Sequence, residues 1–161
     1  MSRHDSRGYS LIELLITLTI MGFVLAIALP SFGHFRDSMS LKRANAQVLQ
    51  DVRRARQLAI TRRAPVVVRF GTPPSTSNIT QYTIHVDTNS DRLVQSSETV
   101  TMYNLPSGTR LSSVSMTPVD SLTFDFSGLL WNGTGGRIVI ANRLDLRDTL
   151  LVSAAGVCFE P

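Results

Sequence analysis

The stretch GYSLIELLI, residues 8–16, begins the segment that decides the fold of this chain. Glu13 is the only charged residue between Tyr9 and Leu29, and Pro30 follows this apolar run. A helix of these 21 residues has a length of about 30 Å, close to the thickness of the hydrocarbon core of a bilayer. The sequence therefore predicts a membrane-spanning helix with one carboxylate near its start.

The carboxylate of Glu13 is unusual in such a segment. A charge at the centre of a membrane costs about 2.5–3.5 kcal/mol on insertion scales, and it usually has a partner. If the chain is cut after Gly8, Tyr9 becomes a new N-terminal residue with a free amine. Glu13 would then pair with the amine of a neighbouring subunit. We interpret Glu13 as an assembly residue rather than a catalytic one.

This segment resembles the prepilin signal of type IV pilins and type II secretion pseudopilins. The resemblance lies in Gly8, the following Tyr-Ser-Leu-Ile-Glu and the position of Pro30, although Tyr9-Ser10 replaces the usual Phe-Thr. It implies that a prepilin peptidase cuts between Gly8 and Tyr9 and methylates the amine of Tyr9. The polar residues 1–8 would be the removed leader.

An ordinary secretory signal is the rival interpretation. Arg3 and Arg7 form a positive region, Leu11–Ile27 is apolar, and Ala26–Ala28 has the Ala-x-Ala form of a cleavage site. Glu13 inside the apolar region argues against this interpretation, and so does the length of the run, since such regions usually have 7–15 residues. A plain N-terminal anchor is the third alternative.

A second helical segment follows Pro30, which should kink or end the first helix because it lacks a backbone donor. Pro65 should end the second segment at Ala64. Apolar residues recur at helical spacing and form one stripe, which predicts an amphipathic stem over residues 30–64. From Leu41 onward the stripe consists of Leu41, Ala44, Val48, Val52, Ala55 and Ala59, widened by Met39, Leu49 and Leu58; Phe35 precedes it at helical spacing.

Residues 65–161 change to short β-branched and alternating runs separated by turn residues, which predicts strands. No further helical segment is expected. The chain is therefore predicted to be an α+β protein, with one long helix packed on an antiparallel β-sheet. The expected strands are Val66–Phe70, Tyr82–Val86, Glu98–Tyr103, Leu111–Met116, Leu122–Phe126, Arg137–Ala141 and Thr149–Ser153.

The β-rich part resembles the domain of GspH/FimT minor pseudopilins in the Phe124–Gly128 turn, the Ile138–Ile140 strand and the late strand before Gly156. With the N-terminal signal, the resemblance covers nearly the whole chain. It implies a non-enzymatic fibre subunit of a type II secretion pseudopilus or a type IV pilus. The subunit would be a single-pass protein of the inner membrane with its β domain in the periplasm. Its partners would be other pilins, the prepilin peptidase and an assembly platform.

The stem is basic, with nine Lys or Arg between Arg36 and Arg69 against two Asp. A solvated face, an acidic partner and DNA all remain open as explanations. No base-reading motif is present, and the tail Gly156–Pro161 lacks the arginines that FimT-like DNA receptors carry there. A DNA-binding minor pilin is therefore the alternative function. The arginines in question are Arg53, Arg54, Arg56, Arg62 and Arg63.

A calcium loop and a plain turn are both compatible with the acidic stretch from Asp87. Asp87, Asn89, Asp91 and Glu98 occupy positions 1, 3, 5 and 12 of the calcium-loop spacing, but Arg92 stands where the glycine belongs. A cation at that position opposes metal binding, so no metal is assigned.

No constellation in the sequence supports catalysis. The three histidines lie in different segments, and no nucleophile motif or zinc-ligand spacing is present. No cofactor is therefore expected. The single cysteine, Cys158, is expected to be a small buried residue. Trp131 is expected to pack in the core, with a partly exposed interface anchor as the alternative.

Overall fold

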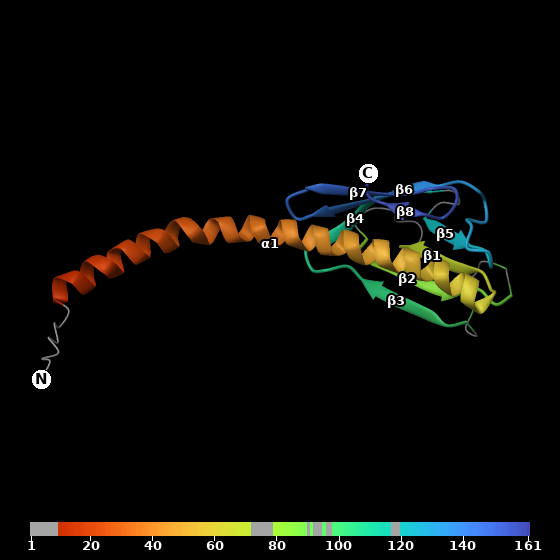
Figure 1. Ribbon diagram of the computed structural model, residues 1–161, viewed down its shortest axis with the longest axis horizontal. Helices are drawn as coiled ribbons and strands as arrows, with labels where there is room; N and C mark the ends of the chain where they lie inside the picture. The colour runs from red at the N-terminus through yellow and green to blue at the C-terminus, as the bar shows by residue number, and fades with distance from the viewer. Residues whose placement is uncertain (1–9, 72–78, 90, 92–94, 96–97, 117–119) are drawn as a thin grey trace, which may run out of the picture. The chain divides into compact units, whose positions relative to one another are not determined.

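One long helix is followed by eight strands in the computed structural model (Figure 1). The structure describes residues 10–71, 79–89, 91, 95, 98–116 and 120–161, with only the backbone described for residues 28–32. Gly8, Tyr9 and Arg92 therefore lie outside the described residues. The chain divides into two compact units, residues 1–36 and residues 37–161, which are considered separately below.

Helix α1 spans Leu11–Arg62. It begins where the carbonyl of Ser10 accepts hydrogen bonds from the backbone of Glu13 and Leu14, at 3.0 and 3.2 Å. The helix continues through Pro30, so of the two expected effects of Pro30 the structure excludes the end of the helix. An interior proline removes one backbone donor, which a helix of this length tolerates. A kink at Pro30 remains a prediction.

The helix ends two residues earlier than the predicted boundary at Ala64. Arg63 has a positive φ of 50°, the left-handed conformation that commonly closes a helix. Pro65 follows and leads into the first strand. Among the described residues, no helix combines the length and the apolar character that crossing a membrane requires.

The stem half of α1 buries its predicted stripe from Leu41 to Ala59. Ala44, Ala55 and Ala59 have no exposed surface, and they belong to the hydrophobic core. Phe35, by contrast, is 62% exposed. It lies before the predicted start of the stripe at Leu41, in the N-terminal unit and outside the core.

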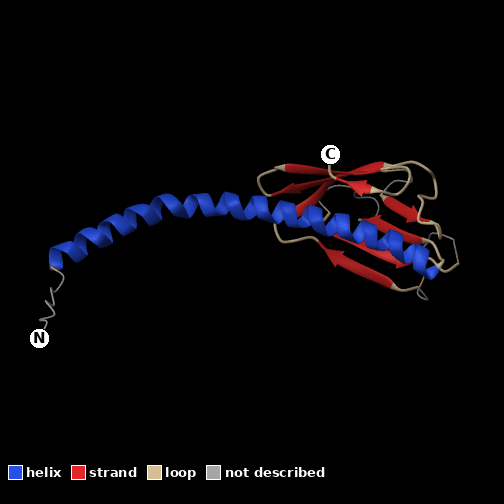
Figure 2. Cartoon of the chain, viewed as in Figure 1, coloured by secondary structure: helices blue, strands red, loops and turns tan. Residues whose placement is uncertain are grey.

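The strands form two four-stranded antiparallel sheets rather than the single sheet expected (Figure 2). The difference arises because the chain changes sheet after β3, returns for β5 and changes again, and local sequence does not encode such pairing. The first sheet has the order β3 (Val100–Asn104), β2 (Gln81–Val86), β1 (Val66–Phe70), β5 (Ser121–Phe124). The second has the order β4 (Thr109–Ser115), β6 (Gly136–Asn142), β7 (Arg147–Val152), β8 (Cys158–Phe159).

A single hydrophobic core joins α1 to both sheets. Val48 and Val52 of α1 are buried in one cluster with Phe70 and Phe124 of the first sheet and Ile138 of the second. The α+β class is therefore confirmed: an N-terminal helix packs on antiparallel sheets.

We predict that Phe124→Ala destabilises the domain by about 3–5 kcal/mol, because truncation leaves a cavity in a close-packed core. Phe124 is fully buried, and a Cβ placed on Gly156 would lie only 2.9 Å from its ring. Urea unfolding of the detergent-solubilised chain, followed by circular dichroism, measures the change. Met102→Ala is the control, since Met102 is 61% exposed on β3. Equal free energies of unfolding for the two variants would contradict this core.

Candidate assembly site

Glu13 lies in the first turn of α1. There its carboxylate is favoured by the positive end of the helix dipole. Ser10 and Glu13 also have the spacing of a capping box, in which a Glu at the third helical position serves the N-cap residue. The sequence analysis missed this local role, although the Ser-x-x-Glu pattern shows it. Any test of Glu13 in assembly must therefore separate its charge from its capping function.

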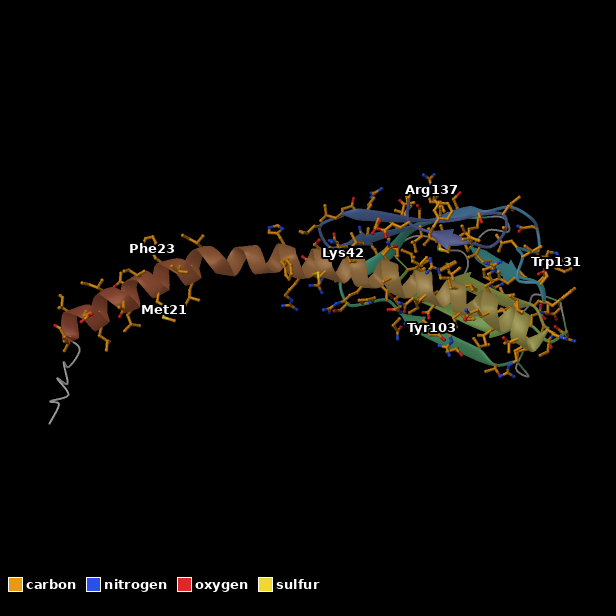
Figure 3. The ribbon with its side chains drawn as sticks, viewed as in Figure 1. Met21, Phe23, Lys42, Tyr103, Trp131 and Arg137 are labelled. Carbon is orange, nitrogen blue, oxygen red and sulfur yellow. The ribbon has the colours of Figure 1, made fainter. Side chains whose placement is uncertain are left out.

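The N-terminal unit is an apolar helix with no hydrophobic partner among the described residues. Met21 is 64% and Phe23 71% exposed, and they project from opposite sides of α1 (Figure 3). A helix that is hydrophobic on all sides is normally buried in a larger protein or in a membrane. The other exposed apolar side chains here are Leu11, Ile12, Leu14, Leu15, Ile16, Leu18, Ile20, Val24, Leu25 and Ile27.

Residues 11–27 contain two hydroxyl groups, and both donate hydrogen bonds to backbone carbonyls of α1. Thr17 Oγ1 donates to the Leu14 carbonyl at 2.9 Å, and Thr19 Oγ1 donates to the Leu15 carbonyl at 2.7 Å. These bonds avoid the free-energy cost of an unpaired hydroxyl donor in an apolar environment. Glu13 is the only charged residue among residues 11–27. Its carboxylate therefore needs a partner in an apolar environment.

Polar side chains of the stem fasten α1 to both sheets. The hydroxyl of Tyr82 in β2 donates a hydrogen bond to Asp51 Oδ2. The same hydroxyl accepts a hydrogen bond from Gln47 Nε2 at 3.2 Å. Asn45 Nδ2 donates to Asp148 Oδ2 of β7 at 2.9 Å. Burial, followed by the bond to Asp51, raises the pKa of Tyr82, so its hydroxyl stays neutral. The sequence analysis did not find these contacts, because they join residues far apart in the chain.

The five stem arginines do not form one continuous binding surface. Arg53 Nη2 donates to the Cys158 carbonyl at 3.4 Å, and Arg54 Nη1 donates to the Tyr103 hydroxyl at 3.5 Å. Arg56 Nε donates to the Gly128 carbonyl at 2.9 Å. These three side chains thus contact three different segments of their own domain.

Arg62 and Arg63 differ from the other stem arginines. Both are exposed at the end of α1, and neither takes part in an ion pair among the described residues. Of the five stem arginines, these two make no hydrogen bond to another element within the described part of the domain, and they are available to a partner.

Glu98 holds two backbone groups of the acidic stretch after β2. Glu98 is 9% exposed. Its Oε1 accepts from the backbone of Thr88 at 3.1 Å, and its Oε2 accepts from the backbone of Gln95 at 3.2 Å. Both carboxylate oxygens thus hold the loop.

The remaining residues of the calcium spacing are not gathered around one point. Asp87 is fully buried, whereas Asn89 and Asp91 are exposed and hydrogen-bonded to each other at 2.9 Å. Within the described part of the chain, no group of three or more His, Cys, Asp or Glu side chains is arranged to hold a metal ion. The geometry favours the plain-turn interpretation.

The sequence analysis predicted that Cys158 and Trp131 are buried, and the structure confirms this only for Cys158. Cys158 is 1% exposed, and burial raises the pKa of its thiol to about 11, although Arg53 opposes the shift. The expectation of a small buried cysteine is confirmed.

Trp131 is 54% exposed, so the expectation of core packing was wrong. Its turn projects from the end of the domain (Figure 3), as the alternative of an interface anchor requires.

His85 is a titratable group that the sequence analysis left in a strand without a role. It is fully buried in β2, and neither ring nitrogen has a hydrogen-bond partner among the described residues. Burial lowers the pKa of His85 below its ordinary value of 6.5; Glu98, Asp87 and Asp91 oppose the shift, and Arg69 adds to it. The folded chain therefore holds this ring neutral.

We predict that the domain loses stability as the pH falls below 6.5. The unfolded chain then binds a proton that folded His85 does not, and the loss is at most about 1.4 kcal/mol per pH unit for one proton. Thermal melts at neutral pH and at a pH about one unit below the ordinary pKa of His measure it. His85→Leu should flatten this dependence, whereas His34→Leu should not, because His34 is exposed. Equal pH dependence in both variants would refute the assignment.

Two models of known protein families match this chain. The prokaryotic N-terminal methylation motif matches residues 3–29, and the type II transport protein GspH family matches residues 44–156. The second match covers more than half of the chain. The fold and the N-terminal motif therefore define a minor pseudopilin or minor pilin. The chain belongs to the GspH family of type II transport proteins.

Solved structures share the fold at low sequence identity. The type IV minor pilin FimU of Pseudomonas aeruginosa aligns with a TM-score of 0.59 and 17% identity, covering 79% of this chain and 92% of FimU. The minor pseudopilin EpsH from the type 2 secretion system of Vibrio cholerae aligns with a TM-score of 0.55 and 15% identity. That alignment covers 76% of this chain and 96% of EpsH. A search of curated proteins found no match.

Proposed function

We propose that this protein is a structural subunit that enters a pseudopilus or pilus through the apolar segment of α1, without enzymatic activity. The observation that carries the proposal is a helix with exposed apolar side chains on all sides, joined to a folded β domain. Such a segment needs an apolar environment. A bilayer before assembly and the packed helices of a fibre afterwards both provide one.

The proposed route begins with a precursor in the inner membrane. Arg3 and Arg7 of the leader would stay on the cytoplasmic side by the positive-inside rule, and the β domain would lie in the periplasm. A prepilin peptidase would cut between Gly8 and Tyr9 and methylate Tyr9. An inner-membrane platform would then insert the subunit among other pilins. The match of the methylation motif to residues 3–29 supports this route.

Mass spectrometry of the membrane-associated protein tests the processing step. We expect a mature chain that begins at Tyr9 with one methyl group on its amine. A mature start near Leu29 would instead indicate an ordinary secretory signal and would overturn the proposal, because the apolar segment would be lost.

We predict that Glu13→Ala blocks incorporation into the fibre but leaves cleavage after Gly8 intact. An unpaired charge is costly in an apolar fibre core, so Glu13 would pair with the N-terminal amine of the adjacent subunit and set the register. Co-purification of the variant with sheared fibres measures incorporation, and mass spectrometry measures cleavage.

Glu13→Gln separates the two roles of this residue. Glutamine keeps the hydrogen-bonding geometry of a capping box and removes the charge. If the charge sets the register, Glu13→Gln fails to incorporate as Glu13→Ala does. Normal incorporation of the glutamine variant would show that Glu13 acts as a helix cap and would refute the pairing.

A further inference from the structure

Five large apolar side chains are exposed on three segments near the end of α1. They come from the last turns of α1, the β5–β6 connection and the β7–β8 turn, and we call them the distal patch. The distal patch consists of Ile60 (48% exposed), Phe126 (63%), Leu129 (47%), Trp131 (54%) and Val157 (45%).

Gly128 brings the three segments together. A Cβ on Gly128 would lie 2.7 Å from Ile60 Cδ1, so the helix packs directly against this glycine. A Cβ on Gly156 would lie 3.0 Å from the Gly128 carbonyl oxygen, which places the β7–β8 turn on its other side. Arg56 Nε donates to the same carbonyl at 2.9 Å. Because Gly128 has a φ of +79°, a side chain there would be strained as well as obstructed.

The turn that carries Phe126 and Leu129 is held in one conformation. Asp125 Oδ1 accepts hydrogen bonds from the Ser127 backbone at 2.9 Å, the Ser127 hydroxyl at 2.6 Å and the Leu129 backbone at 2.9 Å. Burial alone would raise the pKa of Asp125, but these hydrogen bonds outweigh it and lower the pKa. The turn therefore presents its apolar side chains without an ordering cost on binding, which favours affinity.

The composition of the distal patch is typical of a protein interface. Contiguous exposed apolar patches on soluble domains usually mark a site of interaction. Trp and Phe with neighbouring arginines are enriched at the centres of such interfaces. Phe126 is 63% and Trp131 54% exposed.

The charge beside the patch indicates the chemistry of the partner. Arg62 and Arg63 follow Ile60 in the chain, are exposed, and take part in no ion pair in the described ranges. Between Arg53 and Arg63 the helix contains no acidic residue. A partner that covers Ile60 and reaches past the end of α1 therefore also meets these two exposed arginines, and carboxylates on the partner would pair with them.

A nucleic acid fits this surface less well than a protein does. Protein–DNA interfaces are strongly positive, and most of their hydrogen bonds go to phosphate and sugar. Three of the five stem arginines already donate to their own domain. The aliphatic side chains of Ile60, Leu129 and Val157 offer no face on which bases stack.

We propose that the distal patch binds an acidic protein surface, with partner carboxylates on Arg62 and Arg63 and partner apolar side chains on Phe126, Leu129 and Trp131. If the proposed fibre function holds, this partner is a neighbouring subunit that extends beyond the end of α1. The binding chemistry itself does not depend on assembly through the N-terminal segment, so the two proposals can fail separately.

Fluorescence of the detergent-solubilised full chain tests the proposal, because Trp131 is the only tryptophan and lies in the patch. The probe is a synthetic peptide in which Leu and Phe alternate with Glu. Two comparison probes are the same peptide with Lys in place of Glu, and an oligothymidylate. We expect a saturable blue shift with the Glu peptide alone, weakened by added salt because of the charge pairing.

Two variants and one control test the residues. Phe126→Ser, and separately Arg62→Glu combined with Arg63→Glu, should each weaken binding of the Glu peptide about tenfold or more. The charge reversal should also allow the Lys peptide to bind. Leu144→Ser is the matched control: it removes an exposed Leu, 43% accessible, from the β6–β7 turn. That turn lies near Asp37, since Asn142 Nδ2 donates to the Asp37 carbonyl at 3.1 Å.

Several outcomes overturn the proposal. Absence of a saturable shift with the Glu peptide does so, as does equal binding of the Lys peptide. A shift with oligothymidylate alone would assign the surface to nucleic acid instead. If the circular dichroism spectrum of Phe126→Ser shows that this variant is unfolded, the proposal is tested with the charge-reversal variant alone. Arg62 and Arg63 are exposed and outside the core, so their reversal should leave the fold intact. Unchanged Glu-peptide binding in that variant refutes the partner assignment.

Discussion

The burial of one helical stripe between two sheets is the interaction on which the rest of this structure depends. Ala44, Val48, Val52, Ala55 and Ala59 of α1 belong to one core cluster with buried residues of both sheets, so α1 contributes to the core of each. Hydrogen bonds from Asn45 to β7 and from Gln47 to the Tyr82 hydroxyl then fix how the helix is rotated. The same helix therefore serves as the core of the domain and as its connection to the apolar segment.

Much of this architecture could be predicted because it is local. The period of the stem stripe predicted the buried face of α1, and β-branched alternation predicted strands such as Val66–Phe70 at their observed bounds. Turn residues around Gly128 and Gly156 also indicated where strands end. The stripe was predicted from Leu41 onward, and Leu41 is the first residue of α1 in the core.

The remaining features could not be predicted, since they depend on pairing across the chain. The alternation of strands between two sheets brings β4 beside β6 and β5 beside β1, and no short pattern encodes that choice. The separate contacts of Arg53, Arg54 and Arg56 likewise follow from where β8, β3 and the β5–β6 connection lie. At the N-terminus the motif could be recognised in the sequence. The start of α1 at Leu11 adds that Ser10 and Glu13 have the spacing of a capping box, a local role that would compete with the proposed intermolecular role of Glu13.

The position of β8 has a consequence for how the domain folds. Cys158 of β8 pairs beside β7 and belongs to the same core as Leu41 of α1. The core therefore closes only when segments that lie far apart in the chain have come together. Until then, the edge of β7 and the apolar face of the stem are exposed, which makes the interval before closure the period of greatest risk of aggregation.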